Sequence, residues 1–410
     1  MGCQTNSSKI LNLTITVVAI LLGTTIAQIY DTSRVFAQTE QPKPNPLEIT
    51  TPDPLLPQIE RPLSPLERFR LKQTLEEFNN QANAQLKAGN EDEAFNIWYR
   101  EIRIWRAFGP LEEVEALGRV AGVAWDKSRK ADVEIITDRL EAIEQKAQAQ
   151  AELDPILLAA LGKAYEQLRN PEKALVIYQQ ILANAREGGD IEAQEEALNT
   201  IGQLHLAWFD YPNAATTYEE LLVLARSQLD FFGETVYLRQ LSYIYNEAVQ
   251  PENSLRIKKQ IGENYLKNQQ LEQLAELKIS MGSDYEALDK PEDASQYYQE
   301  AFTMAWGLKQ LAVAGDALEK LGNLYRNYDQ NAYALQIYQE LLKVEQQSYD
   351  FFGLMNTYDR IAKIYLEEKD YPHALEAFEK ALELARSLKY QETYFSNQIE
   401  QVNEQIVPAP

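Results

Sequence analysis

Apolar and polar side chains alternate with helical spacing along most of this chain. The stretch LLAALGKAYEQL at 157–168 is followed, after a short polar turn, by PEKALVIYQQIL at 171–182. In both stretches apolar residues recur three and four positions apart, which predicts two amphipathic helices that form a hairpin. Glycine and proline number only 17 each among 410 residues, and good helix formers are abundant. We therefore expect an almost all-α protein.

The hairpin pattern repeats every forty residues. With Pro155 as the first place of a row, six rows align without an insertion. The eighth and twentieth places hold mainly small residues: Gly162, Gly202, Ser242, Gly282, Gly322 and Ala362, then Ala174, Ala214, Ser254, Ala294, Ala334 and Ala374. The eleventh and twenty-fourth places hold mainly aromatic residues: Tyr165, His205, Tyr245, Tyr285, Tyr325 and Tyr365, then Tyr178, Tyr218, Lys258, Tyr298, Tyr338 and Phe378. Because one hairpin cannot bury its apolar side alone, neighbouring hairpins must stack.

This pattern resembles the tetratricopeptide repeat family, whose order of Leu, Gly, Tyr, Ala and Tyr matches Leu158, Gly162, Tyr165, Ala174 and Tyr178. The resemblance extends over the six aligned rows. Their length is similar to that of a longer variant found in several peptide-binding members. The resemblance implies an all-α, right-handed α-solenoid with a concave groove.

Two earlier rows bring the expected number of hairpins to about eight. The first carries three residues of the pattern: Ala82, Ala94 and Trp98. In the second, Glu134 and Asp138 fall on core places, so we predict that its second helix is shifted by three residues and buries Ala131 and Ile135 instead. We expect the solenoid to span residues 66–390. A polar helix and tail at 391–410 should cap it.

Residues 1–37 have the features of an export signal. An apolar run at 10–26 follows a single basic residue, Lys9, and the sequence VFA at 35–37 fits a cleavage site before Gln38. This predicts a secretory signal peptide, with an uncleaved membrane anchor as the alternative. Prolines then recur through 38–65, which predicts an extended, semi-rigid Pro-rich linker. We expect an exported protein of the periplasm or cell envelope that meets a membrane only through an uncleaved N-terminus.

The composition disfavours several classes of function. The formal charge of −23 repels phosphate backbones, and no basic run offsets it, so we expect no nucleic-acid partner. Cys3 is the only cysteine and precedes the apolar run, so the rest of the chain has no thiol chemistry. Of the two histidines, His205 is expected to face the core with a hydrogen bond, and His373 to lie exposed in a turn. We expect no metal site and no cofactor.

The motif DFFG occurs at 230–233 and again at 350–353, and Asp190 occupies the same place in its own row. A protein kinase would also need a glycine-rich loop, a strand lysine and an HRD loop, and the sequence contains none of these. We interpret Asp190, Asp230 and Asp350 as N-caps of the helices that follow them. The paired phenylalanines should pack at the joints between repeats.

A second motif mixes basic and aromatic residues in IWYREIRIWRAF at 97–108. Such interleaving can bind nucleic acid or a membrane surface. However, Phe95, Trp98 and Trp105 share one helical face, as a repeat core requires. We therefore favour core packing with a solvated arginine edge.

The family resemblance places a binding groove on the first helix of each hairpin, at places 2, 5, 9, 12 and 13. Asn and Gln can pair with the backbone of an extended peptide, and Arg or Lys with its carboxylates. A polar lining is equally what a solvated concave face carries, and the Lys and Asn pair of the family's carboxylate clamp is missing. The predicted groove residues are Asn79, Asn83, Lys87, Arg119, Lys127, Lys163, Gln167, Asn199, Gln203, Arg239, Tyr243 and Asn246.

These observations predict a non-enzymatic scaffold that binds another protein or peptide in the groove, with the oligomeric state left open. The fifth of the eight hairpins, with Ser242, Ser254 and Lys258, should be looser than its neighbours. The export signal and linker are also similar to those of exported cyanobacterial tetratricopeptide proteins. That resemblance implies an alternative, a periplasmic assembly factor for a membrane complex such as photosystem II that binds manganese. An enzyme and a pheromone-sensing protein are weaker alternatives.

Overall fold

The computed structural model describes residues 45–59, 61–149 and 154–406. The predicted export signal lies outside these ranges. Within them the chain is all-α and forms seventeen helices: α1 (Pro65–Lys87), α2 (Glu91–Trp105), α3 (Pro110–Asp126), α4 (Lys130–Gln148), α5 (Pro155–Gln167), α6 (Pro171–Gly188), α7 (Ile191–Ala207), α8 (Tyr211–Ser227), α9 (Phe231–Glu247), α10 (Pro251–Lys267), α11 (Leu271–Ala287), α12 (Pro291–Gly307), α13 (Leu311–Asn327), α14 (Asn331–Ser348), α15 (Phe351–Glu367), α16 (Tyr371–Leu388) and α17 (Glu392–Ile406).

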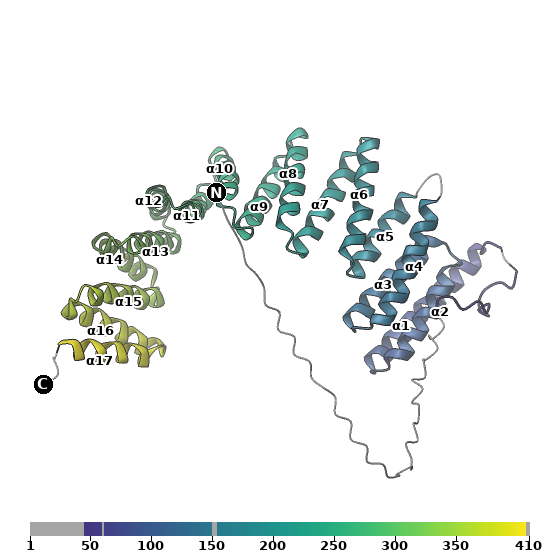
Figure 1. Cartoon of the computed structure of the whole chain (residues 1–410), viewed down its shortest axis with the longest axis horizontal. Coiled ribbons are helices and arrows are strands. Elements are labelled where there is room, and N and C mark those ends of the chain that lie inside the picture. The colour runs from purple at the N-terminus through teal and green to yellow at the C-terminus, as the bar shows by residue number, and fades with distance from the viewer. Residues whose placement is uncertain (1–44, 60, 150–153, 407–410) are drawn as a thin grey trace, which may run out of the picture.

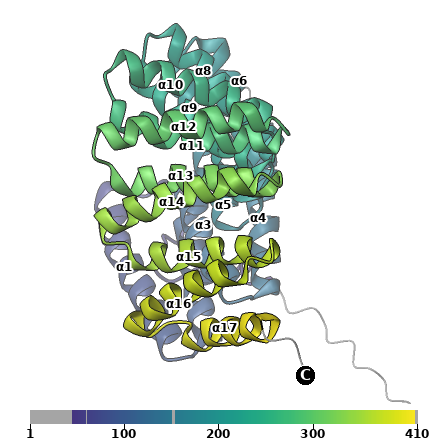
Figure 2. The same cartoon turned by 90° about the vertical axis from the view of Figure 1, so that its left-hand side faces the viewer.

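Helices α1 to α16 pack as eight consecutive hairpins, and α17 packs on α16. The hairpins form an open arc, with α11 and α13 toward its inner side and α12 and α14 toward its outer side (Figure 1). Turned by 90°, the C-terminal helices from α13 to α17 are seen stacked one above another (Figure 2). The all-α architecture of stacked hairpins that the forty-residue period predicts is confirmed.

Close packing within each hairpin explains why small and aromatic places occur together. A Cβ atom at Gly282 would lie 2.5 Å from Cε1 of Tyr298, and one at Gly322 would lie 2.4 Å from Cε1 of Tyr338. Both tyrosines are fully buried. Each ring therefore fills the space that a glycine leaves on the facing helix, and a larger residue there would displace it.

The turns follow a period of twenty residues, half the length of a repeat. Each helix from α7 to α13 has 17 residues. A residue with left-handed backbone follows most helices: Arg169, Gly189, Phe209, Leu229, Val249, Gln269, Asp289, Lys309, Asp329, Tyr349, Lys369 and Lys389. Because both kinds of turn are short and alike, neighbouring helices run antiparallel and the hairpins stack without insertions.

The predicted N-caps are confirmed. The side chains of Asp190, Asp230 and Asp350 accept hydrogen bonds from the backbone N–H groups of Ala193, Phe232 and Gly353. The predicted packing of the phenylalanine pairs is wrong, because each ring is roughly half or more exposed: Phe231, Phe232, Phe351 and Phe352. At these joints the capping carboxylates bond to the backbone of the next helix, while the rings lie on the surface.

The second hairpin differs from the predicted register. Asp132 and Ile136 are buried on α4, whereas Ala131 is exposed and Ile135 only half-buried. The shift from the strict period is thus two residues rather than three. The reason is a polar contact, since Asp132 accepts hydrogen bonds from the Tyr99 hydroxyl at 2.5 Å and from Arg129 Nε at 2.6 Å. A carboxylate with two donors takes a place that most other repeats give to alanine.

Residues 45–59 of the Pro-rich segment pack against α2. Leu47 is completely buried, and Asp53 accepts two hydrogen bonds from Arg100, at 2.7 and 3.2 Å. Arg103 donates to the Pro46 carbonyl, and Arg106 to the Leu47 carbonyl at 3.2 Å. The arginine edge expected to be solvated is therefore partly covered by a segment expected to be a free spacer. The predicted apolar face of α2 is confirmed, since Phe95 and Trp98 are buried and Trp105 is half-buried.

Candidate functional site

The inner helices of successive hairpins are joined by a ladder of polar contacts. Asn199 Nδ2 on α7 donates to the Tyr237 hydroxyl on α9 at 3.0 Å. Arg360 on α15 donates to Glu319 on α13 at 2.6 Å, and Arg326 donates to Glu367 across the same pair of helices at 2.6 Å. These contacts link α7 to α9 and α13 to α15 through long side chains.

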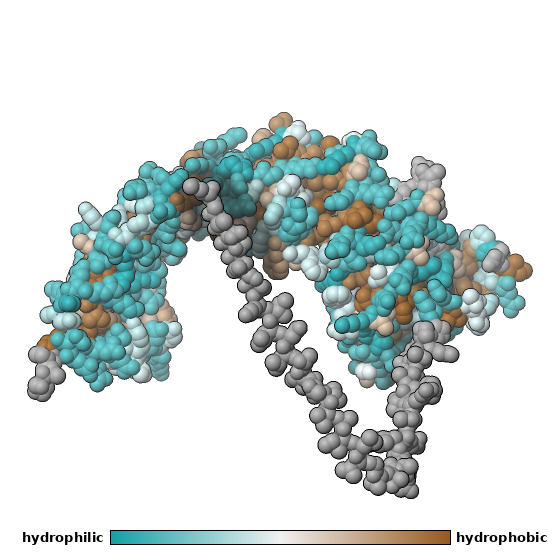
Figure 3. Space-filling view, in the orientation of Figure 1, coloured by the Kyte–Doolittle hydropathy of each residue, from teal (hydrophilic) through white to brown (hydrophobic). Residues whose placement is uncertain are grey.

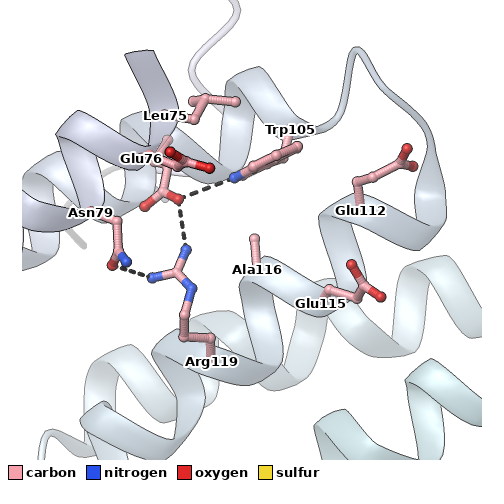
Figure 4. Close-up of a pocket in the computed structure, with 9 residues that line it drawn as sticks. Leu75, Glu76, Asn79, Trp105, Glu112, Glu115, Ala116 and Arg119 are labelled. Carbon is pink, nitrogen blue, oxygen red and sulfur yellow. Dashed lines mark hydrogen bonds and ion pairs between the residues drawn. The ribbon is translucent and has the colours of Figure 1, made fainter. Parts of the chain in front are cut away.

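At the N-terminal end of the arc α1, α2 and α3 enclose a pocket of about 340 Å³ (Figure 4). Residues from all three helices line it: Leu75, Glu76, Asn79, Glu101, Trp105, Glu112, Glu115, Ala116 and Arg119. Leu75, Trp105 and Ala116 provide an apolar wall, while four of the nine side chains carry carboxyl groups.

One hydrogen-bond network ties the pocket together. Arg119 donates to Glu101 Oε1 at 2.6 Å and to Asn79 Oδ1 at 2.7 Å. Figure 4 shows the second of these bonds as a dashed line between the labelled Arg119 and Asn79. The indole of Trp105 also donates to Glu101 Oε1, at 3.1 Å, and that of Trp98 donates to Asn79 Oδ1 at 3.0 Å. Arg119 is thus held by two partners inside the protein and is only partly available to a ligand.

Glu101 is the unusual member of this network. Its residue is only 2% exposed, and its Oε2 atom has no hydrogen-bond partner. Burial raises the pKa of Glu101 above its ordinary value, against the lowering effect of Arg119 and of the Trp105 indole. A buried carboxylate oxygen without a donor is costly, and this agrees with burial as the largest cause of the raised pKa.

The structure separates the predicted groove residues into two groups. Five are half-buried, and most of these bond within the protein: Asn79, Asn83, Arg119, Gln167 and Asn199. Seven are exposed: Lys87, Lys127, Lys163, Gln203, Arg239, Tyr243 and Asn246. Three of the exposed residues have partners of their own. Arg239 donates to the Tyr265 hydroxyl at 3.1 Å, Asn246 accepts from Lys258 at 3.0 Å, and Lys127 pairs with Glu91 at 3.8 Å. The first group shapes the surface, whereas the second can meet a partner.

The sequence prediction missed the acidic members of the pocket, and above all Glu101. It lies on the second helix of its hairpin, while the prediction considered only first helices. A signal was present, because Glu101 lies three residues after Trp98 and four before Trp105 on the apolar face of α2. A charged residue between two tryptophans on such a face requires a partner, here Arg119 from the next hairpin.

His205 lies as predicted, whereas His373 is exposed as predicted but belongs to the first turn of α16 and not to the turn between helices. His205 is half-buried with its Nδ1 3.1 Å from Asp210 Oδ2, and His373 is mostly exposed with its Nδ1 2.7 Å from Asp370 Oδ2. Within the described part of the chain, no three His, Cys, Asp or Glu side chains gather closely enough to hold a metal ion. No helix of that part has both the length and the apolar character to cross a membrane.

Comparison with known proteins gives two segment matches to family models described as tetratricopeptide repeat, at residues 157–192 and 356–388. They correspond to the hairpins α5–α6 and α15–α16. A search of curated protein sequences finds no significant match.

Several solved structures are similar to this chain. Aspartyl phosphate phosphatase F from Bacillus subtilis is 15% identical, with 71% of this chain and 79% of that chain covered and a TM-score of 0.42. The apo form of RapI is 11% identical, with coverage of 81% and 98% and a TM-score of 0.38. BtubC from P. vanneervenii is 19% identical, with coverage of 53% and 92% and a TM-score of 0.38.

Proposed function

Because this chain carries tetratricopeptide repeats, we propose that it is a non-enzymatic scaffold that binds another protein or peptide along its inner helices. The observation that carries the proposal is the set of exposed side chains on α5, α7 and α9: Lys163, Gln203, Arg239 and Tyr243. They combine hydrogen-bond donors with an aromatic ring that is 51% exposed, Tyr243. Tyrosine and arginine are the residue types that most often anchor protein interfaces.

The mixed character of the surface supports binding of a peptide rather than burial in a large apolar interface. Figure 3 shows hydrophilic side chains over most of the visible face of the arc, with hydrophobic ones scattered between them. Arg239 is held over the Tyr265 ring, 5.9 Å from its centroid, while it bonds the hydroxyl. A side chain held in place loses less entropy on binding, so a partner carboxylate could pair with it at lower cost.

Site-specific photo-crosslinking tests this proposal. A benzoylphenylalanine placed at Tyr243 on the inner helix α9 should capture a partner in cells. The same group at Val223, which is 65% exposed on the outer helix α8, is the matched control and should capture none. Capture from Val223 alone would move the binding surface to the outer helices, and capture from neither position would contradict the proposal.

We further propose that the protein acts outside the cytoplasm, which residues 1–37 support through their apolar run and cleavage pattern. Mass spectrometry of the purified protein tests the location together with the cleavage site. A mature chain that begins at Gln38 and fractionates with the cell envelope is expected. An intact chain in the cytoplasmic fraction would contradict export.

A further inference from the structure

A second pocket, of about 300 Å³, lies where the turn between α5 and α6 meets α7 of the next hairpin. Leu204, Ala207 and Trp208 form an apolar wall on the α7 side. Trp208 is 53% exposed and Ala207 is exposed, so a ligand can reach this wall. The pocket also borders the predicted groove, because Gln203 lines it. An open apolar wall with a few polar groups beside it is the usual composition of a binding site.

The charged group of this pocket has no acceptor of its own. Arg169 lines the pocket from the turn and is exposed, and its guanidinium carries donors only. No carboxylate of the described residues lies within ion-pair distance of it, whereas Lys173 of the same hairpin pairs with Glu141 at 3.1 Å. Among the described residues that line the pocket, Glu166 is the one carboxyl group, and it already accepts from the Tyr178 hydroxyl.

The equivalent joint three repeats further along shows what this joint lacks. There Asp289 and Tyr328 occupy the places of Arg169 and Trp208, and the Tyr328 hydroxyl donates to Asp289 Oδ1 at 2.7 Å. That pair is complete because one member donates and the other accepts. A guanidinium and an indole only donate, so Arg169 and Trp208 cannot satisfy each other. The acceptor at this joint therefore comes from solvent or from a ligand.

The charges around the pocket narrow the ligand to a single carboxylate beside an apolar side chain. The two oxygens of a carboxylate match the fork of a guanidinium, and Trp208 lies beside it to cover a neighbouring apolar residue. A phosphate dianion would meet one guanidinium and the carboxyl group of Glu166. A strongly acidic partner would be repelled by the net charge of −23.

We propose that this pocket binds one glutamate or aspartate of the partner polypeptide, with Arg169 paired to its carboxylate and Trp208 packed on the apolar residue next to it. The inference rests on the proposed function, because it assigns two adjacent residues of the partner to the joint between the third and fourth hairpins. Arg169 lies in a turn, outside the groove places considered in the sequence. The partner therefore extends from the inner helices to the edge formed by the turns.

Fluorine NMR on the full chain labelled with 5-fluorotryptophan tests this inference. The chain has five tryptophans, and Trp208→Phe identifies the signal of the pocket. The probes are a blocked peptide, acetyl-Gly-Glu-Leu-Gly-amide, and its analogue with glutamine in place of glutamate. We expect the glutamate peptide to shift the Trp208 signal saturably. The glutamine analogue should bind about threefold to fivefold more weakly, which is the effect of an exposed ion pair.

Matched variants make the result specific. Arg169→Gln removes the cation and places in the left-handed turn a residue type that Gln269 already shows there, so the two peptides should then bind equally. Lys369→Gln, at the same place of the last repeat, removes the same charge and should leave the preference unchanged. Combining Arg169→Asp with Trp208→Tyr installs the donor and acceptor of the other joint. Saturation-transfer NMR, which observes the peptide, should show no binding to this double variant.

Three outcomes would overturn the inference. The first is equal binding of the glutamate and glutamine peptides to the wild type, and the second is no saturable shift up to about 10 mM peptide. The third is a Trp208 shift with the neutral sugar chitobiose and with neither peptide, because the pocket would then bind a glycan. Crosslinking at Tyr243 requires no ligand in this pocket, so capture there beside any of these failures would refute the pocket and retain the scaffold.

Discussion

At the scale of single residues, Glu345 on α14 is a carboxyl group whose charge opposes folding. It is 5% exposed, its Oε1 accepts a hydrogen bond from the Thr357 hydroxyl at 2.9 Å, and its Oε2 has no partner. Burial raises the pKa of Glu345 to about 8, opposed by Thr357 and Arg360 and reinforced by Asp350 and Glu319. The folded protein therefore holds a proton that the unfolded chain releases at much lower pH.

The sign of the resulting pH dependence follows from proton linkage. Because the folded-state pKa lies above the unfolded value, the contribution of Glu345 to stability is present at low pH and is lost as pH rises toward about 8. In urea unfolding, we expect the free energy of unfolding of Glu345→Gln to rise relative to that of the wild type as the pH increases from about 5 to about 9. The exposed Glu340→Gln, on the same helix, should show no such gain. If the free energy of unfolding of Glu345→Gln instead equals that of the wild type at both pH values, the prediction is wrong, because the Glu345 carboxyl would then be hydrated.

At the scale of elements, the segment 45–59 acts as part of the first hairpin. Leu47 is completely buried in the cluster that also contains Trp98, whereas Leu55, in the same segment, is 40% exposed. We expect Leu47→Ala to cost about 2–5 kcal/mol of unfolding free energy, because it leaves a cavity, and Leu55→Ala to cost far less. Urea unfolding followed by tryptophan fluorescence measures both. Equal and small effects would mean that the segment merely rests on α2.

The elements also show what the sequence could and could not predict. The hairpins and the N-caps depend on residues within one repeat, such as Gly322 and Tyr338, so a period of forty was sufficient to predict them. The register of α4 depends on a contact between Asp132 and Tyr99 of the preceding hairpin, which no local pattern contains. The pocket was missed for the same reason, because Glu101 and Arg119 meet only after two hairpins stack.

At the scale of the whole molecule, the core is a series of clusters rather than one body. The cluster around Leu241 and the cluster around Tyr298 meet at the fifth hairpin, where α10 contributes to both. There Lys258 replaces the tyrosine of other repeats, and its Nζ donates to Asp284 Oδ2 of α11 at 2.9 Å and to Asn246 Oδ1 at 3.0 Å. Ser254 Oγ lies 3.0 Å from the same Asp284 oxygen.

The polar side chains at this joint are hydrogen-bonded to one another, so the geometry shows no looseness in the fifth hairpin. That this hairpin is less stable than its neighbours stays a prediction about its free energy of unfolding. Lys258 and Asp284 are 2% and 7% exposed, and burial lowers the pKa of Lys258. Desolvation of two charges offsets most of their attraction, which makes such a pair a weak source of stability. In a repeat array stability propagates between neighbours, so we predict that a weak joint here divides the arc into two cooperative halves.

Two variants test whether the buried ion pair of Lys258 and Asp284 makes this joint less stable than an apolar one would be. Lys258→Tyr alone leaves Asp284 buried without its cation and should lose about 3–5 kcal/mol. Adding Ser242→Gly, Ser254→Ala and Asp284→Leu restores the residue types that other repeats carry, including the glycine that makes room for the tyrosine ring, and this quadruple variant should match or exceed the wild type by up to about 4 kcal/mol. Hydrogen exchange of α10 and α11, read by mass spectrometry, should show slower opening than in the wild type, because the two halves would unfold as one. A quadruple variant as unstable as the single one would instead show that the ion pair holds the joint together, and that the arc is divided elsewhere.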